Sequence, residues 1–150
     1  MKSVIIYLLS SIILSNSCNH SVVFNKYVLK HELVTLLDVL KYMDEVGIYN
    51  SEIVLKQIKL ESNNLNSNLY HTNCNPFGMK IPYIRKSMAI NLNTKDTYSK
   101  YNNLRDAILD YKLYQKYFNI VEDEGYTDKL EKNRYAEDPE YGSKIRRIRI

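Results

Sequence analysis

Residues 51–62 read SEIVLKQIKLES, and this stretch decides the fold because it has the pattern of an amphipathic helix with an acid on its apolar side. Ser51 is a residue type that caps the exposed amides at the start of a helix. Val54 and Ile58 follow at a four-residue step, which places both on one face. Glu61 lies seven residues beyond Val54, so its carboxylate is predicted on that face, at the end of the helix.

A carboxylate at this position has two interpretations. Glu61 is either an ordinary exposed glutamate at a helix end or a functional group in apolar surroundings. Burial against apolar neighbours raises the pKa of a glutamate, and a carboxyl group that keeps its proton at neutral pH can act as a general acid. The helix alone does not decide between the two interpretations.

Helical periodicity continues upstream of this segment. Apolar residues recur at three- and four-residue steps and predict a helix that ends at Gly47; they are Leu29, Leu33, Leu36, Leu37, Leu40 and Met43. Immediately after Ser62, the asparagines at positions 63 and 64 break the pattern. The segment with Glu61 is therefore expected to be a short second helix.

The second half of the chain predicts three more helices. A long amphipathic helix is expected to begin after Asn102 or Asn103, and a short one covers residues 127–132. Asp138-Pro139 has the pattern of a helix start, because aspartate caps exposed amides and proline is tolerated at the first helical position. The last helix is expected to run from there toward the C-terminus.

Residues 69–101 show no sustained helical period. Pro76, Gly78 and Pro82 interrupt this region, which predicts a loop followed by a small excursion or a hairpin. The chain has 150 residues, of which 45% are hydrophobic and 25% charged, as in an ordinary single domain. We therefore expect one mostly helical core with a loop or hairpin lobe.

The N-terminus has the pattern of an export signal. Residues 1–17 combine a positive start, an apolar run over residues 4–14 and small residues before Cys18. The apolar run is about half the ~20 residues that span a bilayer. We expect Cys18 to be the first mature residue, followed by a linker over residues 19–27 and a single domain over residues 28–150.

Cys18 leaves two outcomes open. Cleavage by the ordinary signal peptidase would release an exported protein in which Cys18 is able to pair with Cys74. Lipidation of Cys18, as in bacterial lipoproteins, would anchor the protein to the membrane and leave Cys74 a free thiol. The expected location is the periplasm in the first case and the membrane surface of the cell envelope in the second.

Four motifs, in the same order along the chain, resemble glycoside hydrolase family 73, the bacterial glucosaminidases. Residues 57–62, QIKLES, are similar to the helix end that carries that family's glutamate, and residues 75–80, NPFGMK, follow fourteen residues after Glu61. Residues 98–111, YSKYNNLRDAILDY, resemble the family's aromatic segment and the helix after it. Residues 134–141, RYAEDPEY, resemble its tyrosine-alanine-x-aspartate-proline motif.

The resemblance implies an α+β, mostly helical, lysozyme-like fold. It also implies hydrolysis of the β-1,4 bond from N-acetylglucosamine to N-acetylmuramic acid in peptidoglycan, with Glu61 as general acid and Tyr135 lining the cleft. The residues expected to contact the glycan are Asn75, Phe77, Lys80, Tyr98 and Tyr101. No cofactor and no metal ion are implied, and a monomer is expected.

The second catalytic group is less evident. A glycosidase normally needs a second carboxylate, and the only acid between Lys80 and Lys100 is Asp96, among neighbours typical of a solvated turn. The alternative is stabilisation by the N-acetyl group of the substrate itself, with Tyr135 positioning that group. Both Asp96 and Tyr135 therefore stay candidates.

The net charge and its distribution bear on which other partners the protein could bind. The formal net charge of +4 is too small to indicate nucleic-acid binding, and no motif of a nucleic-acid module is present. Five cations against Asp96 concentrate positive charge in the lobe: Lys80, Arg85, Lys86, Lys95 and Lys100. A cationic lobe would attract the carboxylates of peptidoglycan stems, although solvated surface lysines explain it equally.

Two other functions are compatible with the same motifs. A lytic transglycosylase also works with one glutamate and forms an anhydro-sugar product. A non-catalytic module that binds or assembles the cell wall would keep the fold without the chemistry. The products formed from peptidoglycan discriminate among the three functions.

Overall fold

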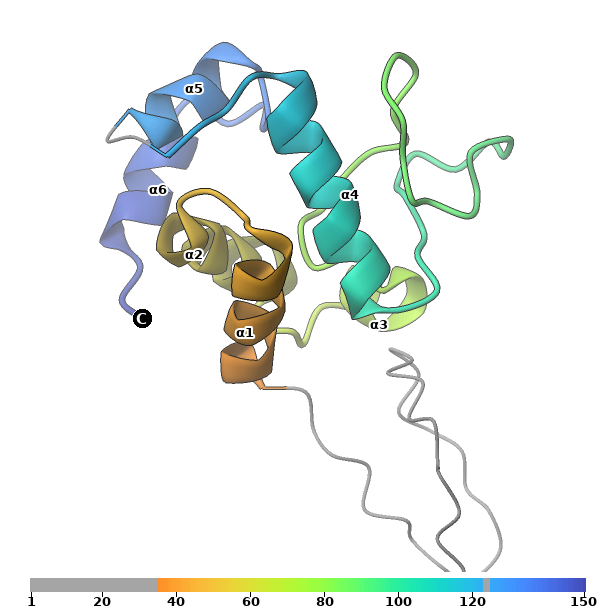
Figure 1. The fold of residues 1–150 in the computed structure, drawn as a ribbon, viewed down its shortest axis with the longest axis horizontal. Coiled ribbons are helices and arrows are strands. Elements are labelled where there is room, and N and C mark those ends of the chain that lie inside the picture. Colours follow the sequence, from red (N-terminus) through yellow and green to blue (C-terminus); the bar gives the residue numbers. More distant parts are fainter. Residues whose placement is uncertain (1–34, 123–124) are drawn as a thin grey trace, which may run out of the picture.

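The computed structural model describes residues 35–122 and 125–150. Within them lie six helices (Figure 1): α1 Leu36–Val46, α2 Ser51–Ser62, α3 Asn68–Asn73, α4 Leu104–Tyr117, α5 Tyr126–Lys132 and α6 Tyr141–Arg147. The described part contains an isolated antiparallel bridge between Lys80 and Tyr98 but no strand. The mostly helical prediction is confirmed, and the α+β character is not. The predicted signal peptide, Cys18, the linker, Leu29 and Leu33 lie outside the described residues, and α1 starts at Leu36, later than the predicted helix.

α1 begins and ends at residues whose chemistry explains its length. The Thr35 hydroxyl accepts the amide of Asp38, and the Asp38 carboxylate accepts the amide of Thr35, which is a reciprocal cap. At the other end Gly47 adopts the left-handed conformation, with φ of 71°, as predicted for the helix end.

No helix in the described ranges is long and apolar enough to cross a membrane.

α2 differs by one residue from its predicted start. Ser51 is the first helical residue, and Asn50 precedes it in the left-handed conformation without a side-chain cap. The backbone amide of Asn50 instead donates to the carboxylate of Glu122. The predicted end is confirmed, because Asn63 and Asn64 both have positive φ, a conformation that asparagine tolerates better than most residues.

The apolar side chains of these helices form one buried core. α1 packs on α2 and on α4, and α6 packs on α2 and on α5. α4 starts where predicted, because the Asn103 side chain accepts the amide of Asp106. The Phe77 ring stacks on the Tyr111 ring of α4 with centroids 4.4 Å apart. Through this contact, the loop after α3 is fixed to the helical core.

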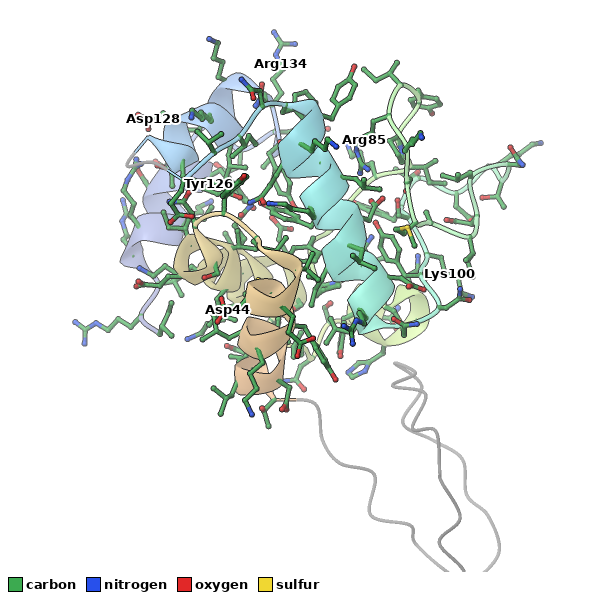
Figure 2. All side chains as sticks on the ribbon, viewed as in Figure 1. Asp44, Arg85, Lys100, Tyr126, Asp128 and Arg134 are labelled. Carbon is green, nitrogen blue, oxygen red and sulfur yellow. The ribbon has the colours of Figure 1, made fainter. Side chains whose placement is uncertain are left out.

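Residues 74–103 form what we call the loop lobe. Its middle extends beyond α4 on the side away from α5 and α6 (Figure 1), whereas Phe77 and Lys80 contact the segment between α5 and α6. A buried ion pair ties the lobe to α4: the Arg85 guanidinium donates to both carboxylate oxygens of Asp110, at 3.1 and 2.9 Å. The backbone amide of Met88 and the hydroxyl of Tyr101 also donate to Asp110. Arg85 is labelled beside α4 in Figure 2. This region is therefore an irregular loop anchored on α4, and the antiparallel bridge between Lys80 and Tyr98 pairs its two ends.

The last helix begins later than predicted. Asp138 does accept a backbone amide, that of Glu140 at 2.9 Å, but this bond closes a turn, and α6 starts at Tyr141. The Lys144 ammonium also donates to Asp138. The expectation that Asp138 has a structural role agrees with these bonds, whereas its position as the helix cap was wrong.

Candidate active site

Glu61 lies in the last turn of α2, where the apolar face of the helix reaches the surface of a cleft. Val54 and Ile58 on the same side are fully buried, and Glu61 itself is half-buried. Burial raises the pKa of the Glu61 carboxyl above its ordinary value, and a hydrogen bond from Tyr141 lowers it by a smaller amount. The side chain therefore holds its proton more tightly than an exposed glutamate does.

Gly78 lies directly against the Glu61 carboxylate. A Cβ atom at Gly78 would be 2.8 Å from Oε2 of Glu61, and the φ of Gly78 is +63°, which other residues rarely adopt. Asn75 shapes this turn: its side-chain amide donates to the carbonyl oxygens of Met79, at 2.8 Å, and Ser99, at 3.0 Å, and its Oδ1 accepts the Met79 amide. Because Gly78 has no side chain, the turn places backbone atoms directly against the Glu61 carboxylate.

A buried chain of hydrogen bonds leads from Glu61 into the core. Tyr141 bonds to Glu61, and the Tyr141 oxygen accepts a hydrogen bond from Nε2 of Gln57 at 3.2 Å. Gln57 Oε1 accepts from the Tyr111 hydroxyl at 2.6 Å, and the hydroxyls of Tyr111 and Tyr126 are 2.7 Å apart. The bond lowers the pKa of Glu61, as a donor to a carboxylate does, so the Tyr141 hydroxyl is the donor to Glu61. The chain fixes the orientation of the carboxyl group.

An open cleft of about 410 Å³ lies over Glu61. This volume is within the range of small-ligand sites in proteins, about 300–1,000 Å³. The structure brings five of the predicted site residues together around it, namely Glu61, Phe77, Lys80, Tyr98 and Tyr135. In the described ranges, no group of three or more histidine, cysteine, aspartate or glutamate side chains is placed to hold a metal ion.

Tyr135 lines the cleft with its ring fixed by other aromatic side chains. The ring stacks on Tyr141 with centroids 5.7 Å apart and makes an edge contact with Tyr114 at 5.3 Å. The hydroxyl donates to the carbonyl oxygen of Phe77 at 2.8 Å. Burial raises the pKa of Tyr135 well above its ordinary value, so the hydroxyl stays neutral and keeps an acceptor lone pair available.

A family model described as mannosyl-glycoprotein endo-beta-N-acetylglucosaminidase matches residues 37–149, which contain α1 to α6 except for the first residue of α1. The chain belongs to this glucosaminidase family. The resemblance predicted from the four motifs is thereby confirmed, and the mostly helical fold is compatible with a lysozyme-like glucosaminidase domain. No curated protein and no solved structure gives a match.

Two residues expected to contact the glycan lie inside this glucosaminidase domain instead. Asn75 is 1% exposed, and its amide is occupied by the turn that carries Gly78. Tyr101 is 2% exposed, and its hydroxyl donates to the Asp110 carboxylate at 2.9 Å. Neither residue lines the cleft. In this arrangement both support the loops around the site, and neither is placed to touch a glycan.

Asp96 lies apart from Glu61 in the glucosaminidase, in a turn of the loop lobe. Its carboxylate accepts hydrogen bonds from Asn91, at 3.1 Å, and from the Thr94 hydroxyl, at 2.9 Å. These two bonds lower the pKa of the Asp96 carboxyl. Asp96 is exposed and is not among the residues that line the cleft. The structure therefore does not bring the predicted second acid to the first.

The glucosaminidase cleft does contain a second acid, Glu137, to which the sequence analysis gave no role. The Lys80 ammonium donates to Oε1 of Glu137 at 2.9 Å, and this ion pair lowers the pKa of the Glu137 carboxyl. The side chain of Glu137 is 90% exposed and that of Lys80 is 58% exposed. The signal for Glu137 was its place directly after Tyr135 and Ala136, in a motif whose middle position the resemblance leaves open.

Acids from other parts of the chain neutralise some of the positive charge that the sequence places in the loop lobe. Lys80 pairs with Glu137 and Arg85 with Asp110, and both acids lie outside the lobe. The predicted excess counted five cations against Asp96 alone, so it omitted these two partners. The basic side chains of the lobe that remain are Lys86, Lys95 and Lys100, and all three are exposed.

A second hollow of about 260 Å³ adjoins the glucosaminidase cleft. The two spaces share Gly78, Lys80, Arg134 and Tyr135 in their walls. Aromatic and aliphatic side chains of the loop lobe and α4 complete the wall of the second hollow, and Tyr83 among them is 99% exposed. Figure 2 labels Arg134 just beyond α5, at the edge of the molecule. The surface over Glu61 is thus an extended depression.

Proposed function

We propose that this glucosaminidase is a peptidoglycan hydrolase that cleaves the β-1,4 bond from N-acetylglucosamine to N-acetylmuramic acid, with Glu61 as general acid. The observation that carries the proposal is a half-buried carboxyl group with a raised pKa in the wall of an open cleft. Membership of a glycosidase family supports the reaction class. The choice of peptidoglycan rests on the motif resemblance.

The chemistry follows from the environment of Glu61. Cleavage of a glycosidic bond requires a proton on the leaving oxygen as the bond to the anomeric carbon breaks. A carboxyl group with a raised pKa holds that proton near neutral pH and releases it as negative charge develops on the oxygen. The hydrogen bond from Tyr141 then stabilises the carboxylate that forms, because a hydroxyl donor favours the charged state.

The shape of the surface supports a polymeric substrate. The cleft over Glu61 continues into the second hollow through the walls that they share. Tyr98 is 41% exposed and Tyr83 is 99% exposed, so both rings are accessible to the faces of sugar rings. A glycan chain laid along this depression would place one linkage at Glu61 and further sugars beside the tyrosines.

Tyr135 is proposed to orient the N-acetyl group of the sugar that is cleaved. Its hydroxyl proton is used by the carbonyl oxygen of Phe77, so the lone pair that remains can accept the acetamido N–H of the substrate. Lys80 and Phe77 line the same cleft and complete the proposed contacts. For Asp96 to be the second acid, as the sequence predicted, the bound substrate would have to reach from the cleft to the turn of the loop lobe that contains Asp96.

The proposal also includes the place of action. We infer that the protein is exported and acts on glycan strands in the cell envelope, either free or held through lipidated Cys18, which lies outside the described residues. Mass spectrometry of the mature protein distinguishes the two forms, since acylation adds the mass of the lipid and proteolytic release alone does not. Neither form changes the chemistry at Glu61.

The products of digestion test the reaction. Purified peptidoglycan strands are treated with the protein, and the new sugar ends are identified by mass spectrometry after borohydride reduction. Reducing N-acetylglucosamine ends are expected. Anhydro-N-acetylmuramic ends would instead indicate a lytic transglycosylase, and binding to the strands without any cleavage would indicate a non-catalytic wall-binding module.

A further inference from the structure

Two segments that are far apart in the chain meet on the wall of the cleft next to Tyr135. Lys80 belongs to the isolated bridge with Tyr98, and Glu137 lies in the turn before α6, 57 residues later. The Lys80 ammonium and the Glu137 carboxylate are 2.9 Å apart. This pair joins the loop lobe to the C-terminal helices at the cleft.

We infer that Glu137 is the second carboxylate of the active site and that it activates the water molecule that attacks the anomeric carbon. The inference rests on the proposed function and adds to it the group that the sequence analysis sought at Asp96. Among the residues that line the cleft, Glu61 and Glu137 are the two acids. Asp96 is held in a turn by Asn91 and Thr94 and does not line the cleft.

The two carboxyl groups have opposite surroundings, which suits them to opposite roles. Glu61 is half-buried against Gly78, and burial raises its pKa, so it keeps a proton to give. Glu137 is exposed and bonded to the Lys80 ammonium, which lowers its pKa, so it is ionised at neutral pH. Divergent environments for two nearby carboxyl groups are the pattern of a general acid and a general base.

Exposure favours the role of base over that of nucleophile. The Glu137 side chain is 90% exposed, so water reaches it without any rearrangement. A nucleophile must instead be held firmly against the anomeric carbon, and a side chain this exposed is not held in that way. Lys80 uses one oxygen of Glu137 and leaves the other for a water molecule.

The reaction balances with these two groups. Glu61 gives its proton to the glycosidic oxygen, and the bond from the anomeric carbon to that oxygen breaks with its electron pair going to the oxygen. The water oxygen bonds to the anomeric carbon while Glu137 takes one of the water protons. Glu61 ends as a carboxylate and Glu137 as a carboxylic acid, and transfer of one proton through solvent restores both. The product sugar has inverted configuration.

Replacement of the carboxylate by a small anion tests this role. In Glu137→Ala, cleavage of purified glycan strands is expected to fall by about 100-fold or more, the usual effect of losing a general acid or base. Sodium azide needs no base to attack, so it is expected to restore bond cleavage and to yield a glycosyl azide of inverted configuration, detected by mass spectrometry and NMR. Asp96→Asn is the matched control and is expected to keep activity within about threefold of the wild type.

The outcomes separate the inference from the proposed function. If the wild type releases reducing N-acetylglucosamine ends and Glu137→Ala does so at a similar rate, only the inference is overturned. A large loss without any glycosyl azide also overturns it, because the carboxylate then has a different role. Lys80→Met removes the ion pair but keeps the carboxylate, and the inference requires this variant to remain more active than Glu137→Ala. A wild type without hydrolytic activity overturns both claims.

Discussion

Gly78 lies so close to Glu61 that a methyl group in its place would be 2.8 Å from the carboxylate oxygen Oε2. The contact joins the end of α2 to the turn that Asn75 shapes, and it packs backbone atoms against one side of the carboxyl group. A side chain at Gly78 must displace either the turn or the proposed catalytic acid. The need for a glycine at position 78 is therefore linked to the position of the Glu61 carboxyl group.

Gly78→Ala is expected to reduce glycan cleavage strongly, because the added methyl group pushes the Glu61 carboxylate out of position. The positive φ adds a cost of about 1–3 kcal/mol in the free energy of unfolding. Gly47→Ala is the control: Gly47 also has a positive φ, of 71°, but a Cβ there meets nothing within 4 Å. Turnover and urea unfolding are measured on both variants. Equal loss of activity in both would show that the contact with Glu61 has no effect.

Tyr141→Phe is expected to shift the alkaline limb of the pH–rate profile to higher pH. The hydrogen bond from Tyr141 lowers the pKa of Glu61, so its removal raises that pKa and keeps the acid protonated to higher pH. The variant also leaves Nε2 of buried Gln57 without this acceptor, at a cost of about 1–3 kcal/mol. The measurement is kcat/KM against pH.

Tyr126→Phe serves as the control for Tyr141→Phe. Its hydroxyl bonds to Tyr111 and Gln115 in the same buried chain, but no such bond joins it to Glu61. It is expected to lower stability and to leave the alkaline limb in place. A limb that moves to lower pH in Tyr141→Phe would refute the assigned direction of the hydrogen bond.

Glu61→Gln is expected to be more stable than the wild type at neutral pH. Because the folded-state pKa of Glu61 is raised above the unfolded value near 4.5, the group stabilises the protein fully only below that pH, and the contribution is lost as pH rises through the folded-state pKa. Glutamine does not ionise and avoids this loss. Urea unfolding at several pH values should show a difference that shrinks below pH 4.5. A difference that is the same at all pH values would contradict the raised pKa.

Asp110→Ala is expected to cost about 3–5 kcal/mol in the free energy of unfolding, because it leaves the buried Arg85 guanidinium without its partner. Arg105→Ala is the matched control, since it removes an arginine–carboxylate pair with Glu45 whose two side chains are more than half exposed. That exposed pair contributes about 0–1 kcal/mol. Similar losses in the two variants, measured by thermal unfolding, would show that burial of the Asp110 pair is unimportant.

The helices were predictable where one residue type determines an end. Gly47 ends α1 and Asn103 caps α4, as the sequence indicated. α3 was not predicted, because its six residues, NLYHTN, are too few and too polar to show an apolar period. It forms because Ser67 accepts the amide of Tyr70 at its start. Asp138 was misplaced since the same side-chain bond can cap a helix or close a turn.

The candidate active site was predictable only in its local part. The place of Glu61 on the apolar side of α2 was predictable, because its position relative to Val54 and Ile58 is a property of one helix. The place of Glu137 in the cleft wall was not predictable, since its partner Lys80 is 57 residues away and nothing local marks the pair. The buried positions of Asn75 and Tyr101 likewise depend on Ser99 and Asp110, which approach only in the folded chain.

The turnover of purified peptidoglycan strands by Glu61→Gln tests the central claim most directly. Glu52→Gln provides the matched control, because Glu52 is on the same helix with its side chain 76% exposed. The account predicts a loss of about 100-fold or more for Glu61→Gln, with the fold intact by circular dichroism, and near wild-type turnover for Glu52→Gln. Unchanged turnover by Glu61→Gln would contradict the assignment of Glu61 as the general acid.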